Sequence, residues 1–325
     1  MLSSANLRAL SLFDQRFVLF SGKGGVGKTT VASGFALSCA KRGEKTLLIQ
    51  LNVKDKVSSF FGSQDVSTDI IEVEDNLFAV NITPEAALEE YGLMILKVKL
   101  IYKAVFENRI VESFLESIPG LNDLLMLGKS HFHATEQNAD GSFVWDKVVV
   151  DAPATGHGIF FLQIPSVITS ILSSGHMYEE ARKIEEFLGD PELTSLNLVT
   201  LPEEMPVNET LMLRDIIEDK LDVDVQSIVA NSVYPSRFSS DQATWMEDAL
   251  EHVDEGYLEG LLEAAVFRTR RVSLQKQYLD QLHDEVELPI LEVPYYFVER
   301  VTFPVIRDIA NRLNSQICGD REAET

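Results

Sequence analysis

Residues 22–30 read Gly-Lys-Gly-Gly-Val-Gly-Lys-Thr-Thr, and this stretch decides the fold. It fits the pattern G-x-x-x-x-G-K-[ST], in which backbone N–H groups surround phosphate oxygens while the last lysine and hydroxyl reach the terminal phosphate and Mg²⁺. An apolar run suited to a buried strand precedes it at residues 16–20, and an Ala-rich helical segment follows at residues 31–42. This order points the N-terminus of the helix at a bound anion. The stretch therefore predicts a nucleoside triphosphate site.

The composition is that of a globular protein and argues against several function classes. The chain has 325 residues, 45% of them apolar, and can bury a large core. Its net charge of −23 argues against nucleic acid or an anionic membrane as an obligate partner, although it leaves room for a local basic patch. Residues 158–172 form the least polar long stretch, but it contains Pro165 and falls short of the roughly 20 residues that a membrane-spanning helix needs. With no signal-peptide pattern at the N-terminus, we expect a cytoplasmic protein without a transmembrane segment.

Apolar runs alternate with helical patterns along the rest of the chain. Besides the first strand, the candidate strands are residues 45–50, 77–82, 147–150, 196–201, 225–229 and 288–293. Because helical stretches separate them, the connections are expected to be right-handed crossovers. The pattern predicts an α/β fold of the P-loop NTPase type, with a doubly wound, mostly parallel sheet.

The same pattern suggests how the chain is divided. We expect a single domain over residues 1–325, whose core comprises residues 13–84 and 142–317. Residues 85–141 are expected to form a helical insertion subdomain, because no strand is evident there and large apolar residues recur at helical spacing. These apolar residues belong either to the core or to a client-binding groove. Residues 318–325 are expected to form an acidic tail.

A second chemical landmark is an apolar run, residues 148–150, that ends in Asp151 and continues as Ala-Pro-Ala-Thr-Gly-His-Gly. A carboxylate at the end of a buried strand beside a phosphate loop is where NTPases hold the hydration shell of Mg²⁺. The alternative is an aspartate that only caps the following turn. Gly156 and Gly158 favour a loop that can move with the terminal phosphate.

The cysteines and histidines give little support for a transition-metal site. Cys39 and Cys318 lie far apart and form no C-x-x-C, so a zinc clamp or an iron–sulfur cluster within one chain is not supported. Buried or incidental thiols are the favoured interpretation. His131 and His133 flank Phe132, and this spacing places both rings on one face only in a strand.

Several segments together resemble a known family. The phosphate loop with its early Lys23 resembles the deviant Walker A form of the MinD, ParA and nitrogenase-reductase class. Residues 151–158 resemble the switch II segment, D-T-A-P-T-G-H-T, of the arsenite-pump ATPase (ArsA) and the tail-anchored-protein targeting ATPase. Further similar segments, in chain order, are Ile-Pro-Gly at 118–120, Leu-Gln-Ile-Pro at 162–165, the stretch 201–210, Ala230-Asn231 and Pro294. The chain is thus similar to bacterial ArsA-like ATPases over nearly its whole length.

The resemblance implies a set of phosphate and metal contacts. The backbone N–H groups that would surround the phosphates belong to Gly24, Gly25, Val26 and Gly27. Lys28 would bridge the β- and γ-phosphates, and Thr30 would touch the α-phosphate. Thr29 would ligate Mg²⁺, and Asp151 would hold a Mg²⁺-bound water.

It also implies contacts to the base and a role across a dimer. Asn231 would read the adenine, and Pro294 would lead into the loop on the adenine side. No guanine signature, [NT]-K-x-D, is present in the chain, which agrees with ATP. Lys23 would reach the partner's nucleotide and place positive charge where the transition state builds negative charge.

The chain departs from the family in switch I. Counted without gaps from Thr30, Asn52 stands where the family has the aspartate that orients the attacking water. An amide can form hydrogen bonds but cannot take a proton. Asp55, one helical turn later, is a possible substitute at the wrong spacing. The predicted catalytic set is therefore Lys23, Lys28, Asn52 and Asp151.

Two function classes follow. The first is an ATPase whose Mg-ATP-dependent dimerisation, as homodimer or heterodimer, drives a conformational switch acting on a client or membrane-protein partner. The second is a nucleotide-binding scaffold or weakly hydrolysing regulatory subunit, paired with a paralogous ATPase. Because the zinc-clamp C-x-x-C and the clustered arsenite-sensing cysteines are missing, the sequence supports neither zinc-clamped tail-anchor delivery nor arsenite transport.

Overall fold

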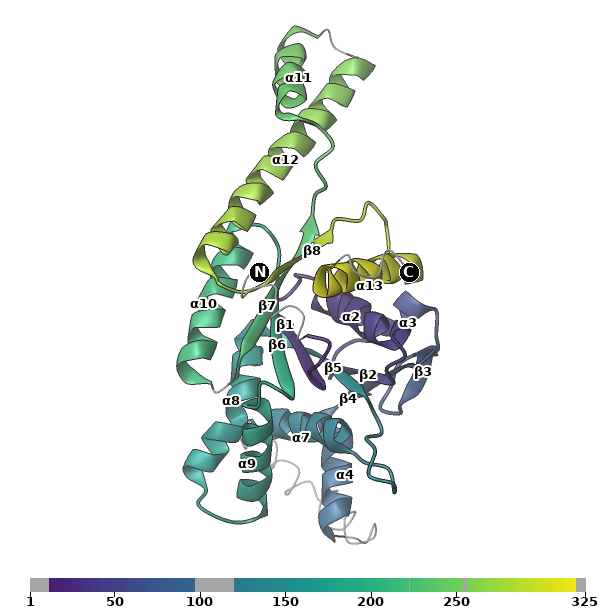
Figure 1. Ribbon diagram of the computed structural model, residues 1–325, viewed down its shortest axis with the longest axis vertical. Coiled ribbons are helices and arrows are strands. Elements are labelled where there is room, and N and C mark those ends of the chain that lie inside the picture. The colour runs from purple at the N-terminus through teal and green to yellow at the C-terminus, as the bar shows by residue number, and fades with distance from the viewer. Residues whose placement is uncertain (1–11, 97–119, 222, 254–255, 320–325) are drawn as a thin grey trace.

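An eight-stranded sheet forms the centre of the computed structural model, which describes residues 12–96, 120–221, 223–253 and 256–319 (Figure 1). The strand order is β3-β4-β2-β5-β1-β6-β7-β8, and every pairing is parallel except that of β3 with β4. The strands are β1 (Phe17–Gly22), β2 (Thr46–Leu51), β3 (Ile71–Glu74), β4 (Leu77–Ile82), β5 (Lys147–Ala154), β6 (Thr194–Thr200), β7 (Val225–Val233) and β8 (Ile290–Pro294). The predicted doubly wound, mostly parallel α/β sheet is confirmed.

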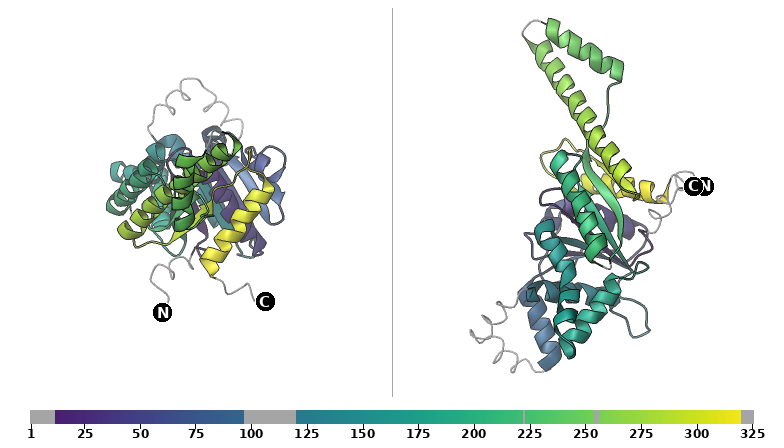
Figure 2. Two further views of the ribbon diagram at one scale, coloured as in Figure 1. Left: turned by 90° about the horizontal axis from the view of Figure 1, so that it is seen from above. Right: turned by 90° about the vertical axis from the view of Figure 1, so that its left-hand side faces the viewer.

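Helices cover both faces of the sheet and extend from two of its ends (Figures 1 and 2). They are α2 (Lys28–Lys41), α3 (Val57–Phe61), α4 (Pro84–Leu96), α7 (Leu121–Thr135), α8 (Thr155–Ile171), α9 (His176–Leu188), α10 (Glu204–Lys220), α11 (Ser240–His252), α12 (Tyr257–Glu285) and α13 (Phe303–Cys318). On one face the core is shared with α2 and α13, and on the other with α7, α8, α9 and α10.

The two faces explain why the strands read as continuous apolar runs. Successive side chains of a strand point to opposite faces, so Val18 and Leu48 contribute to the core beneath α2. Their neighbours Leu19 and Ile49 contribute to the core on the other face. Because helices bury both faces, a central parallel strand carries hardly any solvent-facing position.

Two elements were not predicted. Strand β3 is a short edge strand in which glutamates alternate with Ile71 and Val73, so it lacks the long apolar run by which the other strands were recognised. The second is a hairpin of α11 and α12 that projects from the body (Figure 2). Its small core consists of Met246, Leu262 and Val266, which a pattern search cannot assign to a separate unit.

The helical insertion is partly described. Helices α4 and α7 lie with α9 at the end of the molecule opposite the hairpin (Figure 1), while residues 97–119 lie outside the described residues. The antiparallel Gln137–Phe143 bridge closes a turn at residues 138–142. The domain limits remain a prediction.

Two expectations about chain segments need correction. The loop expected around Gly156 and Gly158 is helical, because α8 begins at Thr155 and runs directly into an apolar helical segment. Cys318, assigned to the tail, is the last residue of α13, and residues 320–325 lie outside the described part. Among the helices that the structure describes, none combines the length and apolarity needed to cross a membrane.

The contact between α2 and α13 gives a test of the packing. A Cβ at Gly34 would collide with Cγ2 of Ile309, a branched side chain fixed in the core. We expect Gly34→Ala to lower the free energy of unfolding, because overpacking costs roughly 1–3 kcal/mol, more than the helix propensity gained. Chemical denaturation measures the effect.

Gly260 in α12 provides the matched control. It is exposed and no described atom lies within 4 Å of an added Cβ. Gly260→Ala should raise the free energy of unfolding by up to about 1 kcal/mol, the difference in helix propensity. Equal effects of the two substitutions would contradict the close contact of α2 with α13.

Candidate nucleotide-binding site

The phosphate loop joins β1 to α2 and is fixed by the two strands next to it. Gly22, Gly25 and Gly27 adopt φ values of 146°, 88° and 93°, which only glycine adopts readily. A Cβ at Gly22 would collide with the carbonyl oxygen of Val199 in β6, and one at Gly27 with the side chain of Asn231. These glycines are therefore required both by their conformation and by the space around them.

The rest of the loop follows the expected arrangement. Gly24 and Gly25 are exposed at its tip, while Val26 is buried in the core and anchors it. Gly27 precedes the first residue of α2, so Thr30 lies in the first turn of that helix. The backbone N–H groups at the start of a helix attract an anion. The first turn of α2 is fully described and contains no acidic side chain that would repel one.

Lys28 is folded back over the loop. Its Nζ donates hydrogen bonds to the carbonyl oxygens of Gly22 at 3.0 Å and Lys23 at 3.1 Å. Burial lowers the pKa of Lys28, an effect that the nearby charge of Asp151 opposes and that of Lys56 reinforces. The loop thus holds a positive charge through its own carbonyl groups.

Asp151 and Thr29 meet at the end of β5. The hydroxyl of Thr29 donates a 2.6 Å hydrogen bond to Oδ2 of Asp151, so this aspartate does not simply cap the turn that follows it. Burial raises the pKa of Asp151 to about 6, although the bond from Thr29 and the charge of Lys28 favour the ionised form. A carboxylate and a hydroxyl are ligands suited to Mg²⁺, so these residues fit the predicted metal.

The expected base-side residues lie at the ends of β7 and β8. Asn231 is buried, and its Nδ2 donates a 2.8 Å hydrogen bond to the carbonyl oxygen of Val26 in the loop. Pro294 ends β8, and the next residue, Tyr295, stacks on Tyr234 with 4.6 Å between ring centroids. This aromatic pair was not predicted, because its only signal in the sequence is a tyrosine after each of the two strands.

The switch I residues Asn52 and Asp55 make no contact with other described residues that assigns them a role at the phosphate site. Asn52 is exposed with φ 48°, and its N–H donates to the carbonyl oxygen of Ile82 at 2.8 Å. No hydrogen bond between described residues joins it to Lys28 or Asp151. Both oxygens of Asp55 accept backbone N–H groups, from Ser58 and Val66, so this carboxylate serves to shape its own loop rather than to replace Asn52.

Three site residues were missed or undervalued. Lys56 lies close enough for its charge to lower the pKa of both Lys28 and Asp151, and no role was predicted for it. Glu209 of α10 forms a 2.6 Å ion pair with Nζ of Lys23. Gln50, at the end of β2, had been regarded only as part of a strand.

The other candidate metal residues do not converge. His131 and His133 lie on α7, where the ring of His131 packs edge-on against Phe187 and His133 lies beside Glu136. Burial lowers the pKa of His133 to about 4. Within the described ranges, no group of three or more His, Cys, Asp or Glu side chains could hold a metal ion.

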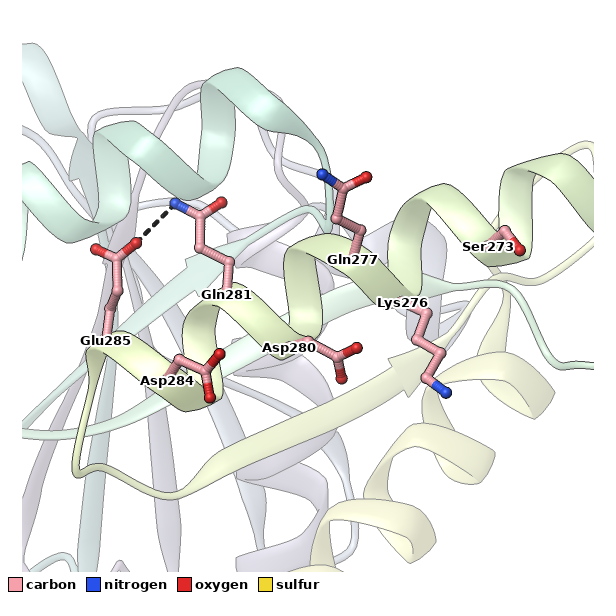
Figure 3. A pocket seen from close by; sticks show the side chains of 7 residues that line it. All are labelled: Ser273, Lys276, Gln277, Asp280, Gln281, Asp284 and Glu285. Atoms are coloured by element: carbon pink, nitrogen blue, oxygen red, sulfur yellow. Dashed lines mark hydrogen bonds between the residues drawn. The ribbon is translucent and has the colours of Figure 1, made fainter.

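A groove on α12 is distinct from this site. It has a volume of about 450 Å³ and is lined by the polar side chains of a single helix (Figure 3). Its lining residues are Ser273, Lys276, Gln277, Asp280, Gln281, Asp284 and Glu285. Because no residue of the phosphate loop contributes to it, it is not the nucleotide site.

Comparison with known proteins identifies the family. The sequence model of the family described as "Anion-transporting ATPase" matches residues 15–176 and 173–315. The chain belongs to this family. The resemblance found in the motifs is therefore confirmed, and ATPase activity is the function of the family as a whole.

Named relatives agree with this assignment at low identity. "ATPase BagA" of Mycobacterium tuberculosis is 28% identical over 300 residues, which cover 86% of this chain and 87% of the relative. "ATPase GET3" of Kluyveromyces lactis is 26% identical over 308 residues, covering 84% and 81%. The protein of that name from Candida glabrata is 25% identical over 297 residues, covering 78% and 84%.

The raised pKa of Asp151 predicts a pH dependence of the nucleotide-free protein. Because the folded-state pKa of about 6 exceeds the ordinary aspartate pKa of 3.8, this group stabilises the fold below the lower value, and that contribution is lost as the pH rises through 6. Asp151→Asn should therefore be more stable than wild type at pH 7, by up to roughly 3 kcal/mol. Denaturation in the presence of a chelator measures this.

The advantage of Asp151→Asn should shrink as the pH falls toward 4, where the wild-type carboxyl is protonated in the folded state. Asp190→Asn, at a half-buried position in the turn before β6, serves as a control for a general charge effect. A stability difference for Asp151→Asn that is the same at both pH values would contradict the burial argument.

Proposed function

We propose that the chain is a Mg²⁺-dependent ATPase that works as a dimer, with a second copy or a paralogous chain, and that nucleotide-driven closure of the dimer acts on a client protein. The observation that carries this proposal is the direction of Lys23. Its side chain points away from its own phosphate loop and pairs with Glu209 on α10. A lysine directed outward from the loop is suited to reach a nucleotide in a partner.

The exposure of this ion pair supports the proposal. The side chains of Lys23 and Glu209 are 33% and 41% exposed, so the pair lies at the surface and costs little to break. Met205 and Met212 flank Glu209 on α10 at helical spacing and are both 64% exposed. Flexible apolar side chains around a charge that can be released are suited to a contact that forms and dissociates.

The chemistry divides among the residues of the site. The loop N–H groups and Lys28 bind and orient the phosphates, and Thr29 and Asp151 hold the metal. When bound, Mg²⁺ neutralises charge on the phosphate oxygens. Asn52 contributes hydrogen bonding to the attacking water but cannot accept its proton. We infer that the chain binds ATP in spite of Asn52, and that its intrinsic ATP hydrolysis is slow.

A groove in the helical end of the molecule supports the proposal that the chain acts on a client protein. It has a volume of about 560 Å³ and lies between α4, α7 and α9. Leucines of α7, with Ile184 of α9, provide apolar side chains, while Glu90, Lys129 and Lys183 supply charge around them. In the described part of the insertion, the apolar residues thus serve both as core and as a groove wall. The proposed location remains the cytoplasm.

The dimer proposal predicts a separation of binding from assembly. Lys23→Ala should leave ATP affinity nearly unchanged, because its side chain does not enter its own loop, while weakening Mg-ATP-dependent dimerisation and turnover. Light scattering with saturating Mg-ATP, alone and with the paralogous chain, measures assembly. Lys276→Ala on the exposed side of α12 is the matched control and should change neither. If the wild-type chain stays monomeric under all these conditions, the proposed role of Lys23 at the partner's nucleotide is wrong.

The scaffold alternative is favoured by Asn52 itself, together with the engagement of Asp55 by backbone groups. Asn52→Asp should increase single-turnover hydrolysis of bound ATP by on the order of 10²-fold, the scale of a general base, without a large change in ATP affinity. Asn76→Asp is the control, because Asn76 also has a positive φ but lies in the turn between β3 and β4.

The two function classes then separate by rate. A slow wild type and a fast Asn52→Asp variant would favour the regulatory subunit. A wild type as fast as the variant would leave an ordinary ATPase and would contradict the proposed effect of the amide.

A further inference from the structure

Gln50 is a buried polar residue without an evident structural purpose. It lies in β2, within the run Thr-Leu-Leu-Ile-Gln-Leu, and is 0% exposed. Neither its Oε1 nor its Nε2 has a hydrogen-bond partner among the residues that the structure describes. Buried polar side chains in folded proteins nearly always have a partner, so an amide left without one calls for an explanation.

The strand register places this amide beside the metal residues. Gln50 lies directly opposite Asp151 on β5, and neighbouring strands are about 4.8 Å apart. Both side chains lie on the same face as Leu48 and Val149, two residues earlier in each strand, which pack beneath α2. Since Asp151 reaches Thr29 in the first turn of α2, the amide of Gln50 faces the same region.

The neighbouring polar groups are already engaged. On its other side Gln50 lies opposite Asn81 of β4, whose amide exchanges hydrogen bonds with the backbone of Val53. Lys28 is bonded to the carbonyl groups of its own loop. Of the polar row Asn81, Gln50 and Asp151, only the central member lacks a partner within the described part of the chain.

A neutral amide suits a buried position beside Asp151 better than an apolar or an acidic side chain would. An apolar residue would pack better if the strand end served only the core, whereas a second carboxylate would repel Asp151. An amide offers one acceptor and two donor hydrogens without adding charge. It can therefore bind a water molecule beside Asp151 while the carboxylate remains free to serve the metal.

We propose that Gln50 is a further binding residue of the nucleotide site, whose amide holds a water of the Mg²⁺ hydration shell beside Asp151. The inference rests on the proposed Mg²⁺-nucleotide function and deepens it. Gln50 is then a positioning residue, because it acts on the metal through a water. The proposal predicts that replacing Gln50 weakens nucleotide binding only when Mg²⁺ is present, which the phosphate loop alone does not require.

The test replaces the amide by apolar side chains of similar size, in Gln50→Leu and Gln50→Met. ADP affinity is measured by calorimetry with Mg²⁺ and with a chelator, so that turnover plays no part. We expect both variants to unfold at a higher temperature without ligand, because a buried unpaired amide is removed. The gain in ADP affinity that Mg²⁺ provides should fall by about tenfold, because one hydrogen bond to the metal-bound water is lost. The ADP affinity measured in the chelator should stay unchanged.

Ser38→Ala is the matched control. The hydroxyl of Ser38 is also buried and lacks a partner among the described residues, but it lies in α2 more than two turns beyond Thr29. Its removal should leave the Mg²⁺ dependence of ADP binding as in wild type.

The outcomes distinguish this inference from the function on which it rests. If either folded Gln50 variant keeps the full Mg²⁺ gain, the amide is only a buried polar group and the inference is wrong. A loss of ADP affinity that is equal with and without Mg²⁺ would also overturn it, because the phosphate loop would then be distorted. If wild type itself binds no Mg-ADP, the proposed function fails instead.

Discussion

The hydrogen bond between Thr29 and Asp151 is the interaction on which the arrangement of the site depends. It joins the first turn of α2 to the end of β5, two elements more than a hundred residues apart in sequence. Its position requires that β5 lie next to β1, which the parallel pairing of these strands provides. The same bond keeps a buried carboxylate beside a lysine, so that a charge that burial disfavours is retained where a metal can use it.

The sheet order brings the remaining groups to the same edge. In a parallel sheet the carboxyl ends of the strands lie together, so the loops after β1, β2, β5, β7 and β8 converge although they are dispersed along the chain. The phosphate loop is held from both sides of its strand. Asp151 contacts it from β5, and Asn231 contacts it from β7, across β6.

How much of this could be predicted from sequence depended on the range of the interaction. The phosphate loop is encoded by consecutive residues, and the central strands by apolar runs, so both were predicted correctly. The β3 edge and the α11–α12 hairpin were missed because partly exposed elements carry weaker patterns. Lys23–Glu209 and Gln50–Asp151 could not be foreseen, since each pairing exists only once distant elements are packed together. The role proposed for Asn52 rests on its chemistry alone, because its backbone N–H bonds to Ile82 at the end of β4 and no hydrogen bond between described residues joins it to Lys28 or Asp151.

Hydrogen bonds join the hairpin to the segment that follows Asn231, where the base is expected. Gln275, buried in α12, accepts the N–H of Tyr234 through Oε1 and donates from Nε2 to the carbonyl oxygen of Ser232. These two bonds clamp the backbone that follows Asn231, and the far end of α12 leads directly into β8. Gln275 lies nearer the C-terminal end of this 29-residue helix, so the tip of the hairpin lies at the end of the longer part. Turning the helix about its axis requires either that the clamp be broken or that Tyr234 move with it.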